Sequence, residues 1–431
     1  MNNSRLPHVV VLGGGFGGLE FCKHLPAHLA RITLVDRENH HLFQPLLYQV
    51  ATAGLSAPEI AQPIRSILSG RKNLVVLLNE VKRIDLRKQA VRLTTGELTY
   101  DYLVIALGGV TSYFGHPEWE KHAPGLKSLQ DALRIRHDVL TAFEQAENET
   151  DTDARERLMT MVVVGGGPTG VEMAGSLSEL ARQVLRSDFA HIDPTKAKVI
   201  LLEGGPRILS HLPPELSQQA EDQLRSLGVD VQVGAQVQDI RRDGLMVNGC
   251  FQPAATMVWA AGICANPAVD SLQVPKDRAG RILVNPTLNI PDHPEAFAIG
   301  DIVNLTDTQG VQVPGVSPAA IQMAQHAAAT IHASITSGNQ PAEHEPAFIY
   351  FDKGTMATIG RSRAVAKIGH LEFSGFTAWL SWLFVHLVFL VGFRNRLAVF
   401  FQWVYSYFTF KRGARIITHA GPLKQTGRRP K

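Results

Sequence analysis

The stretch that decides the fold is HVVVLGGGFGGLE at residues 8–20, an apolar run followed by a glycine cluster and a helical pattern. The same pattern recurs as MVVVGGGPTGVE at residues 161–172. Both contain Gly-x-Gly-x-x-Gly between a predicted strand and a predicted helix, the context typical of a dinucleotide-binding loop. The first glycine makes the tight turn, the second lets the backbone approach a pyrophosphate, and the third lets helix pack on strand. The sequence therefore predicts two Rossmann-like units.

Each glycine loop is followed by a second apolar segment that ends in a carboxylate. These segments are RITLVD at residues 31–36 and KVILLE at residues 198–203. An acid at this place can accept hydrogen bonds from both ribose hydroxyls and would repel a 2′-phosphate. Two structural turns with chance carboxylates are the alternative, which the repetition makes improbable. We predict two dinucleotide sites, the first formed by Gly13, Gly15, Phe16, Gly17, Gly18 and Asp36, and the second by Gly165, Gly167, Gly170 and Glu203.

A third glycine signal, AFAIGD at residues 296–301, lies far from both loops. An apolar strand ending in Gly300-Asp301 fits a return to the first unit, where Asp301 could reach the ribitol and pyrophosphate of a flavin dinucleotide. With YLVIALG at residues 102–108, whose Gly108 is a further candidate contact, these motifs resemble the two-dinucleotide-binding flavoprotein superfamily. In that superfamily the first site takes FAD, the second takes NAD(P)H, and the NAD domain is inserted into the FAD domain.

The resemblance implies an α/β fold with two Rossmann-like dinucleotide-binding domains and a C-terminal helical region that anchors the protein to a membrane. The expected boundaries are residues 1–120 and 265–335 for the two parts of the FAD domain, 121–264 for the NADH domain, and 336–431 for the C-terminal domain. The expected cofactors are FAD and NAD(H). Residues 144–157 are strongly charged, and we expect them to form a solvated connection.

The formal net charge of the 431-residue chain is only +3, but the charge is unevenly distributed. Glu372 is the last of 39 acidic residues, and nine of the 42 Lys and Arg follow it, so residues 1–372 carry −6 and residues 373–431 carry +9. The small total argues against a nucleic-acid-binding surface. The basic end coincides with an aromatic segment, because residues 371–410 hold 14 of the 31 aromatic residues.

Two stretches without Lys, Arg, Asp or Glu, residues 373–393 and 397–410, flank Arg394 and Arg396. A membrane-spanning hairpin would return through a second segment that rises only about 21 Å, short of the ~30 Å hydrocarbon core. A single span would place basic residues opposite the nucleotide-binding body. We therefore expect amphipathic helices at about 373–410 that lie in one leaflet, with arginines at the headgroups. A true span and a buried or homodimer-interface role are the alternatives.

Several kinds of chemistry are not supported by the sequence. The cysteines, Cys22, Cys250 and Cys264, are odd in number and lack paired spacing, so we expect neither a disulfide framework nor the redox dithiol of glutathione-reductase-like enzymes. His40 and His41 are adjacent and would diverge in a strand, and no metal-ligand motif accompanies them, so we expect no metal site.

More specific motifs cover nearly the whole chain. They are FQPLLYQVATAGL at residues 43–55, GGGPTGVEMAG at 165–175, YFDKGTMATIGR at 350–361 and GFRNR at 392–396. In this order they resemble the type II, non-proton-pumping NADH:quinone oxidoreductases. The resemblance implies hydride transfer from NADH to FAD and then transfer of two electrons to a membrane quinone in the respiratory chain. It also implies a peripheral, monotopic location at the cytoplasmic face of a bacterial inner membrane.

Three further residues are candidates for the site. The resemblance suggests that Glu172 faces the flavin near the nicotinamide or a proton path, although the helix dipole alone would also favour a carboxylate there. Gln322 matches the second glutamine of the family motif Ala-Gln-x-x-x-Gln at the quinone site, or it is simply bonded to backbone. Pro318 replaces the first glutamine and removes its amide. Pro45 is expected to wall the flavin.

Two other functions remain open. One is a related FAD/NAD(P)H reductase with a different acceptor, such as a protein or another quinone, which would fit the presence of Pro318. The other is a membrane-bound flavoprotein sensor that responds to the nicotinamide ratio with little turnover. The tail favours the quinone, because a membrane surface is where a lipid quinone is found.

Overall fold

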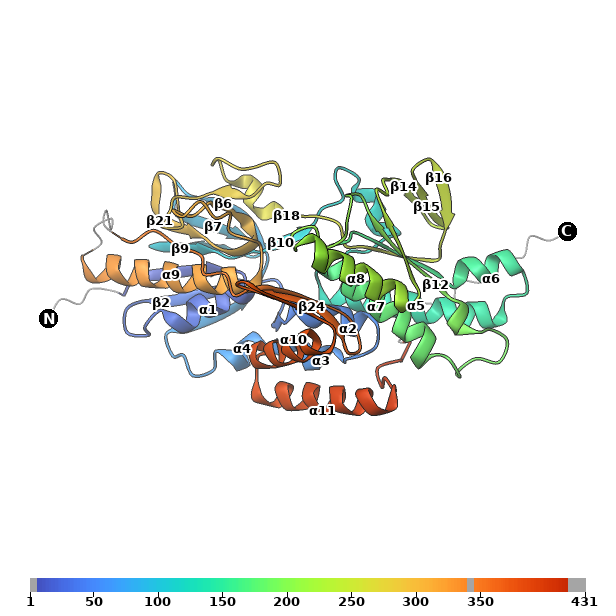
Figure 1. Ribbon diagram of the computed structural model, residues 1–431. Coiled ribbons are helices and arrows are strands. Elements are labelled where there is room, and N and C mark those ends of the chain that lie inside the picture. The colour runs from blue at the N-terminus through green and yellow to red at the C-terminus, as the bar shows by residue number, and fades with distance from the viewer. Residues whose placement is uncertain (1–5, 339–344, 418–431) are drawn as a thin grey trace.

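Two parallel sheets form the body of the protein in a computed structural model that describes residues 6–338 and 345–417 (Figure 1). The first sheet has the strand order β20-β21-β9-β1-β2-β5, and all neighbours except β20 and β21 run parallel. Its central strands β1 and β9 are buried on both faces, as their continuous apolar sequences predict. The strands are β1 (His8–Leu12), β2 (Arg31–Asp36), β5 (Leu74–Leu78), β9 (Tyr102–Ile105), β20 (Asn289–Ile290) and β21 (His293–Ala298).

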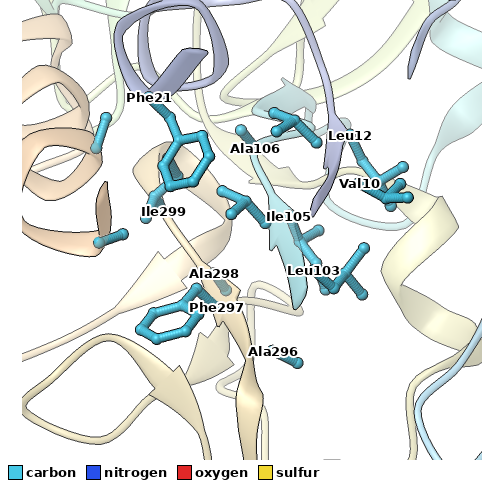
Figure 2. Close-up of a cluster of buried hydrophobic side chains, with 14 of the residues drawn as sticks. Val10, Leu12, Phe21, Leu103, Ile105, Ala106, Ala296, Phe297, Ala298 and Ile299 are labelled. Carbon is cyan, nitrogen blue, oxygen red and sulfur yellow. The ribbon is translucent and has the colours of Figure 1, made fainter. Parts of the chain in front are cut away.

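Strand β21 comes late in the chain and pairs with β9, so that residues 296–298 lie opposite residues 103–105. Figure 2 shows the side chains of both strands in one buried cluster with Val10 and Leu12 of β1 and Phe21 of α1 (Phe16–His24). The returning strand that the sequence predicted is confirmed.

The second sheet has the order β13-β12-β11-β17 and is parallel throughout. Helix α7 (Pro168–Glu179) follows its first strand, and α8 (Pro214–Ser226) ends just before Gly228, whose φ is +84°. The chain passes between the two sheets along β10 (Gly109–Thr111) and β18 (Ile263–Ala265), which pair antiparallel. The strands of this second sheet are β11 (Thr160–Val164), β12 (Lys198–Glu203), β13 (Val229–Val233) and β17 (Thr256–Trp259).

The charged segment 144–157 is largely exposed, as expected of a solvated connection, and most of it is helical. Helix α5 runs from Leu129 to Asn148 and α6 (Thr152–Leu158) follows after three residues. The Ser128 hydroxyl caps α5 by accepting the Asp131 N–H at 3.1 Å, and Asp151 caps α6 through the Ala154 N–H at 2.7 Å. The charges lie on an exposed face, while successive turns of α5 bury apolar residues on the opposite face.

The C-terminal region begins with an antiparallel sheet of β23 (Thr355–Gly360), β24 (Arg363–Ile368) and β25 (Leu371–Ser374). Helices α10 (Phe376–Phe389) and α11 (Phe393–Thr409) follow and run along one face of the body below that sheet (Figure 1). The predicted helical region is therefore confirmed. Neither α10, nor α11, nor any other helix in the described part of the chain is long and apolar enough to cross a bilayer.

Shorter elements complete the described chain. Those before residue 130 are β3 (His40–Leu42), η1 (Gln44–Leu46), α2 (Leu47–Ala51), α3 (Ala57–Ile60), β4 (Ala61–Pro63), α4 (Ile64–Ile67), β6 (Val81–Asp85), β7 (Ala90–Leu93), β8 (Glu97–Thr99) and η2 (Pro117–Lys121). Those after it are η3 (Leu180–Val184), η4 (Pro194–Lys196), β14 (Val237–Arg241), β15 (Gly244–Val247), β16 (Cys250–Pro253), η5 (Pro267–Ser271), β19 (Ile282–Leu283), η6 (Gly300–Ile302), β22 (Val303–Asn304) and α9 (Ser317–Thr336).

Candidate active site

The first glycine loop joins β1 to α1 in a geometry that only glycine allows at two positions. Gly13 has φ +102°, and a Cβ atom on Gly18 would lie 1.8 Å from the Gly13 carbonyl oxygen. Gly15, in contrast, has nothing within 4 Å of its Cβ position. Helix α1 has no side-chain cap and no acid in its first turn, so its N–H groups stay available to an anion. This open cradle fits a pyrophosphate.

The second loop repeats this geometry between β11 and α7. Gly165 has φ +111°, and a Cβ atom on Gly170 would again lie 1.8 Å from a carbonyl oxygen, that of Gly165. Nothing lies within 4 Å of the Cβ position of Gly167. Helix α7 likewise has neither a side-chain cap nor an acid in its first turn. The two loops therefore offer two equivalent anion sites, as the sequence pattern predicted.

The two strand-end carboxylates are held beside these loops by backbone N–H groups. Asp36 accepts hydrogen bonds from Gly14 at 2.5 Å and from Glu38 at 2.7 Å. Glu203 accepts from Gly166 and Gly205, both at 2.6 Å. Burial raises the pKa of Asp36, and its backbone N–H donors oppose that rise. Each oxygen keeps a second acceptor direction, which is what recognition of ribose hydroxyls requires.

The returning strand brings Asp301 to the same edge of the sheet as the first loop. Gly300 has φ +79° and turns the chain directly after β21, and a Cβ atom on Gly17 would touch Ile299 at 3.1 Å. The Asp301 side chain lies 3.4 Å from the Cβ position of Gly109, the neighbour of Gly108. Lys127 Nζ is 3.7 Å from Asp301 Oδ2. No sequence pattern pointed to this lysine, because it comes from the segment before α5.

Aromatic rings pack together beside the first loop, where residues 40–46 approach it. The Phe16 ring meets His41 edge-on, with 4.9 Å between ring centroids, and Phe43 at 5.8 Å. Burial lowers the pKa of His41 to about 4, so its imidazole is neutral. Its Nε2 atom is buried and bonds to none of the described residues, an orphaned polar atom that fits a bound group. Pro45 lies half-buried in η1 nearby.

A largely apolar cavity of about 550 Å³ lies between α7, β23 and the C-terminal helices. The sequence predicted no such cavity, because it assigned the aromatic residues of the tail to helices in a membrane leaflet, and of the polar lining residues it singled out only Glu172. The aromatic lining residues include Phe376, Trp379, Trp382, Phe384, Phe400, Trp403, Tyr407, Phe408 and Phe410. The polar ones include Tyr48, Gln49, Glu172, Ser176, Glu179, Thr358 and Arg412.

Glu172 lies in the wall of this cavity on α7, one turn after the second loop. The Thr358 N–H donates to its Oε1 atom over 3.4 Å. Burial raises the pKa of Glu172 to about 8, and the Thr358 N–H and the nearby Trp382 indole oppose this rise only in part. Desolvation thus outweighs the helix dipole, the balance that the sequence left open. Glu172 is mostly protonated at neutral pH and can give up a proton inside an apolar cavity.

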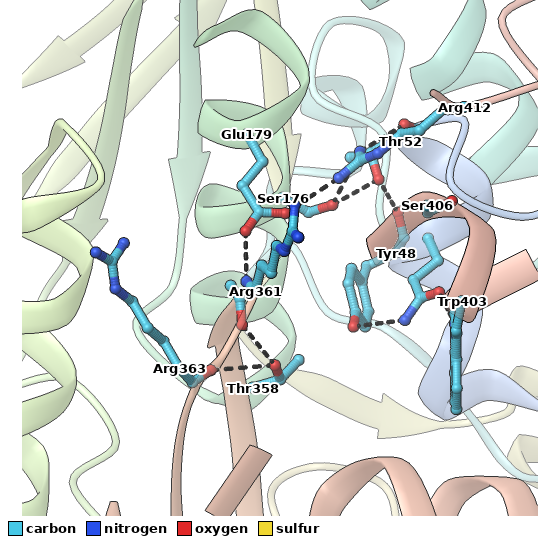
Figure 3. A network of polar contacts seen from close by, with 12 residues as sticks. Tyr48, Thr52, Ser176, Glu179, Thr358, Arg361, Arg363, Trp403, Ser406 and Arg412 are labelled. Atoms are coloured by element: carbon cyan, nitrogen blue, oxygen red, sulfur yellow. Dashed lines mark hydrogen bonds and ion pairs between the residues drawn. The ribbon is translucent and has the colours of Figure 1, made fainter. Parts of the chain in front are cut away.

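A half-buried ion pair closes the other end of the cavity (Figure 3). Arg412, which follows α11, lies 3.2 Å from Glu179 at the end of α7 and donates to the Thr52 carbonyl oxygen at 2.9 Å. The Arg361 N–H also donates to Glu179, at 2.5 Å. Burial lowers the pKa of Arg412, while the Glu179 charge opposes this shift.

Two arginines of the basic tail bind to the body of the protein, a role that the sequence did not predict. Arg412 pairs with Glu179, and Arg415 pairs with Asp188. Both acids belong to the nucleotide-binding body, so these arginines bind the tail to the body. Arg394, Arg396 and Lys411 are exposed. The last four basic residues, Lys424, Arg428, Arg429 and Lys431, lie outside the described residues.

Gln322 on α9 is bonded to backbone, the simpler of the two roles considered for it. Its Nε2 atom donates to the Phe351 carbonyl oxygen and its Oε1 atom accepts the Phe351 N–H, both at 3.0 Å. It is not among the residues that line the cavity. Pro318 sits in the first turn of α9, where its missing N–H has no intrahelical partner to lose.

Comparison with known families agrees with this geometry. The model of the pyridine nucleotide-disulphide oxidoreductase family matches residues 7–329, and that of the NDH2 C-terminal domain matches residues 353–412. The chain is 45% identical to the type II NADH:quinone oxidoreductase Ndh of Mycobacterium tuberculosis, over 98% of this chain and 92% of the relative. The chain belongs to the type II NADH:quinone oxidoreductases. It is also 44% identical to NdhA of the same organism, over 95% and 89% of the two chains.

Solved structures show the same fold. NDH2 from Plasmodium falciparum, solved in complex with NADH, has a TM-score of 0.88 at 19% identity and covers 96% of this chain and 100% of its own. The sulfide:quinone oxidoreductase of Aquifex aeolicus has a TM-score of 0.70 at 19% identity, covering 96% of both chains. The predicted family and fold class are confirmed, and the family binds FAD and NADH.

Proposed function

We propose that this type II NADH:quinone oxidoreductase oxidises NADH and reduces a membrane quinone to the quinol without pumping protons. The net reaction takes NADH, one proton and the quinone to NAD⁺ and the quinol. FAD, when bound, supplies the two-electron chemistry that links the two substrates. The observation that carries the proposal is the cavity that Glu172 enters from one side and the exposed aromatic helices α10 and α11 wall from the other.

The two glycine loops support a division of the cofactors. FAD would be held by the first loop with Phe16 and Asp36, by Gly108, by Gly300 and Asp301, and by Pro45 beside it. NADH would be held by the second loop and Glu203. We propose the corresponding domains as residues 1–120 and 265–335 for FAD, 121–264 for NADH and 336–431 for the C-terminal domain.

The quinone would enter the cavity between α10 and α11, where nearly all lining side chains are apolar or aromatic. Glu172 would supply a proton to the reduced quinone, because burial keeps it protonated at neutral pH. Gln322 would take part as a positioning residue, since its amide fixes the backbone of Phe351, whose side chain is 70% exposed.

The proposal is tested by NADH oxidation with the purified protein, with and without a short-chain quinone. We expect bound flavin to be reduced by NADH and reoxidised rapidly by the quinone. Flavin that is reduced but not reoxidised by the quinone would show a different acceptor. If NADH reduces the flavin slowly and the quinone reoxidises it slowly, the alternative function of a flavoprotein sensor with little turnover would be favoured.

NADPH is expected to be a poor substrate. Glu203 stands where the adenosine ribose would bind, and a like charge placed there costs several kcal/mol, so we expect kcat/KM for NADPH to be about 10²-fold below that for NADH. Glu203→Ala should narrow this ratio about tenfold, while Glu215→Ala on the exposed surface of α8 should leave it unchanged. Equal activity of the unaltered enzyme with both nucleotides would contradict the role of Glu203.

We propose that α10 and α11 rest on the cytoplasmic leaflet of a bacterial inner membrane as a monotopic anchor. Their exposed side chains include Phe384, Phe393, Phe401 and Phe408, each more than 60% exposed. An apolar patch of this kind marks a contact surface. A homodimer that covers the same face is the alternative occupant, and the next experiment distinguishes the two.

Replacing Phe401 and Phe408 by glutamate is expected to release the enzyme from vesicles that contain anionic lipid. Each side chain would lose about 1.5–3 kcal/mol of burial and gain a charge, so the membrane-bound fraction should fall at least tenfold in a flotation assay. Phe251→Glu on β16, which is 41% exposed in the wild type, is the matched control and should bind as before. A double variant that floats normally but becomes monomeric would support the dimer instead.

A further inference from the structure

A chain of two hydrogen bonds connects helix α11 to a tyrosine in the cavity wall. The Trp403 indole Nε1 donates to Gln49 Oε1 at 2.8 Å, and Gln49 Nε2 lies 2.9 Å from the Tyr48 hydroxyl oxygen. All three residues line the cavity. Tyr48 and Trp403 lie close together at the edge of the polar network in Figure 3.

The chemistry of these groups fixes the direction of each bond. An indole N–H can only donate, so Trp403 fixes the carbonyl oxygen of the Gln49 amide toward itself. The amide nitrogen must then face Tyr48, and because that nitrogen has only hydrogens to offer, the phenol oxygen accepts. The Tyr48 O–H hydrogen is therefore left to donate elsewhere, and the cavity is the space beside it.

The Tyr48 hydroxyl stays protonated and is shielded from bulk water. Burial raises the pKa of Tyr48 well above its usual value, and the charge of Glu172 raises it further. Only 6% of Tyr48 is exposed, so bulk water is not its partner. The same wall holds the Trp382 indole, which lies close enough to Glu172 to lower the pKa of that carboxyl. A hydroxyl hydrogen without an acceptor suits a ligand that carries a carbonyl oxygen.

We propose that the Tyr48 hydroxyl donates a hydrogen bond to a carbonyl oxygen of the quinone, and that Gln49 and Trp403 are positioning residues that aim it. This inference rests on the proposed quinone reduction in the same cavity. It also makes the site dependent on α11, because the donor that fixes the orientation of the amide comes from the proposed membrane helix.

The test separates the two halves of the reaction in the FAD-loaded enzyme. Tyr48→Phe should slow flavin reoxidation by a short-chain quinone about tenfold, the effect of one lost hydrogen bond, and leave anaerobic flavin reduction by NADH unchanged. Reoxidation by ferricyanide, which has no carbonyl to bind, should also be unchanged. Trp403→Phe should slow the quinone step by a smaller factor, because the side-chain amide of Gln49 is then free to flip and face Tyr48 with its oxygen in part of the molecules.

The positioning role is tested by combining the two substitutions. If Trp403 acts through Tyr48, adding Trp403→Phe to Tyr48→Phe should slow the quinone step no further. Trp119→Phe on η2 removes a buried indole that does not line the cavity and should have little effect. Fully additive losses, or a Tyr48→Phe enzyme that quinone reoxidises at the normal rate, would overturn the inference. Wild-type flavin that quinone does not reoxidise would instead overturn the proposed function.

Discussion

Gly18→Ala is expected to give a protein that purifies almost without flavin, whereas Gly170→Ala is expected to retain flavin and lose its reduction by NADH. In each variant the new methyl group would fall 1.8 Å from a carbonyl oxygen of the preceding turn. Relief of such overlap requires the helix to move off the strand, at a cost of about 1–3 kcal/mol or more. That movement carries the helix N-terminus away from the pyrophosphate, so cofactor binding is lost before the fold is.

The ratio of flavin to protein absorbance measures the first effect, and the anaerobic rate of flavin reduction measures the second. We expect both to fall by at least about tenfold in the respective variants, the factor that 1.4 kcal/mol represents. Gly70→Ala is the matched control, since nothing lies within 4 Å of its Cβ position. Flavin loss in Gly170→Ala with retention in Gly18→Ala would reverse the assignment of the two loops.

Glu172→Gln is expected to slow quinone reduction about 10²-fold at pH 7, the usual contribution of a placed general acid. Because burial raises the pKa of Glu172 to about 8, the wild type holds this proton below pH 8 and loses it above. The wild-type rate should therefore fall as the pH rises through about 8, while the rate of the variant should stay flat across the same interval. A variant with the same pH profile as the wild type would assign the titration to another group.

The same pKa shift predicts a stability change that does not depend on turnover. A carboxyl whose pKa rises on folding from 4.5 to about 8 stabilises the fold fully below its unfolded value and loses that contribution as the pH rises toward 8. Between pH 5 and pH 8 the Tm of the wild type should therefore fall more than that of Glu172→Gln. Glu215→Gln, at an exposed position, should follow the wild type.

The sequence predicted the parts of the site that depend on local geometry. A glycine is required at position 13 by its backbone angle and at position 18 by a contact five residues away, so one short motif reports both. Asp36 and Glu203 were predictable for a similar reason, because each ends the strand that follows its glycine loop. The return of the chain at Asp301 to the first sheet was also predictable, because a buried strand ending in Gly-Asp can join an α/β fold at only a few positions.

The parts that the sequence did not predict depend on contacts between distant segments. Trp403 and Gln49 are 354 positions apart, and the sequence around neither residue predicts their hydrogen bond. Arg412 and Arg415 were counted with a basic tail, yet partners on α7 and beyond it bind them to the body. Gln322 shows the converse, since the motif located the residue but could not show that the Phe351 backbone occupies its amide.

The position of β21 between β20 and β9 has a consequence for biosynthesis. The second sheet uses residues 160–259 only, so it can close while the ribosome is still adding the chain that follows. The first sheet begins eight residues from the N-terminus but cannot be completed until residue 298 has emerged. Domains fold as units during synthesis. The nested NADH domain should therefore mature first on the ribosome, and flavin capture should wait for a segment made long after the loop that holds the flavin.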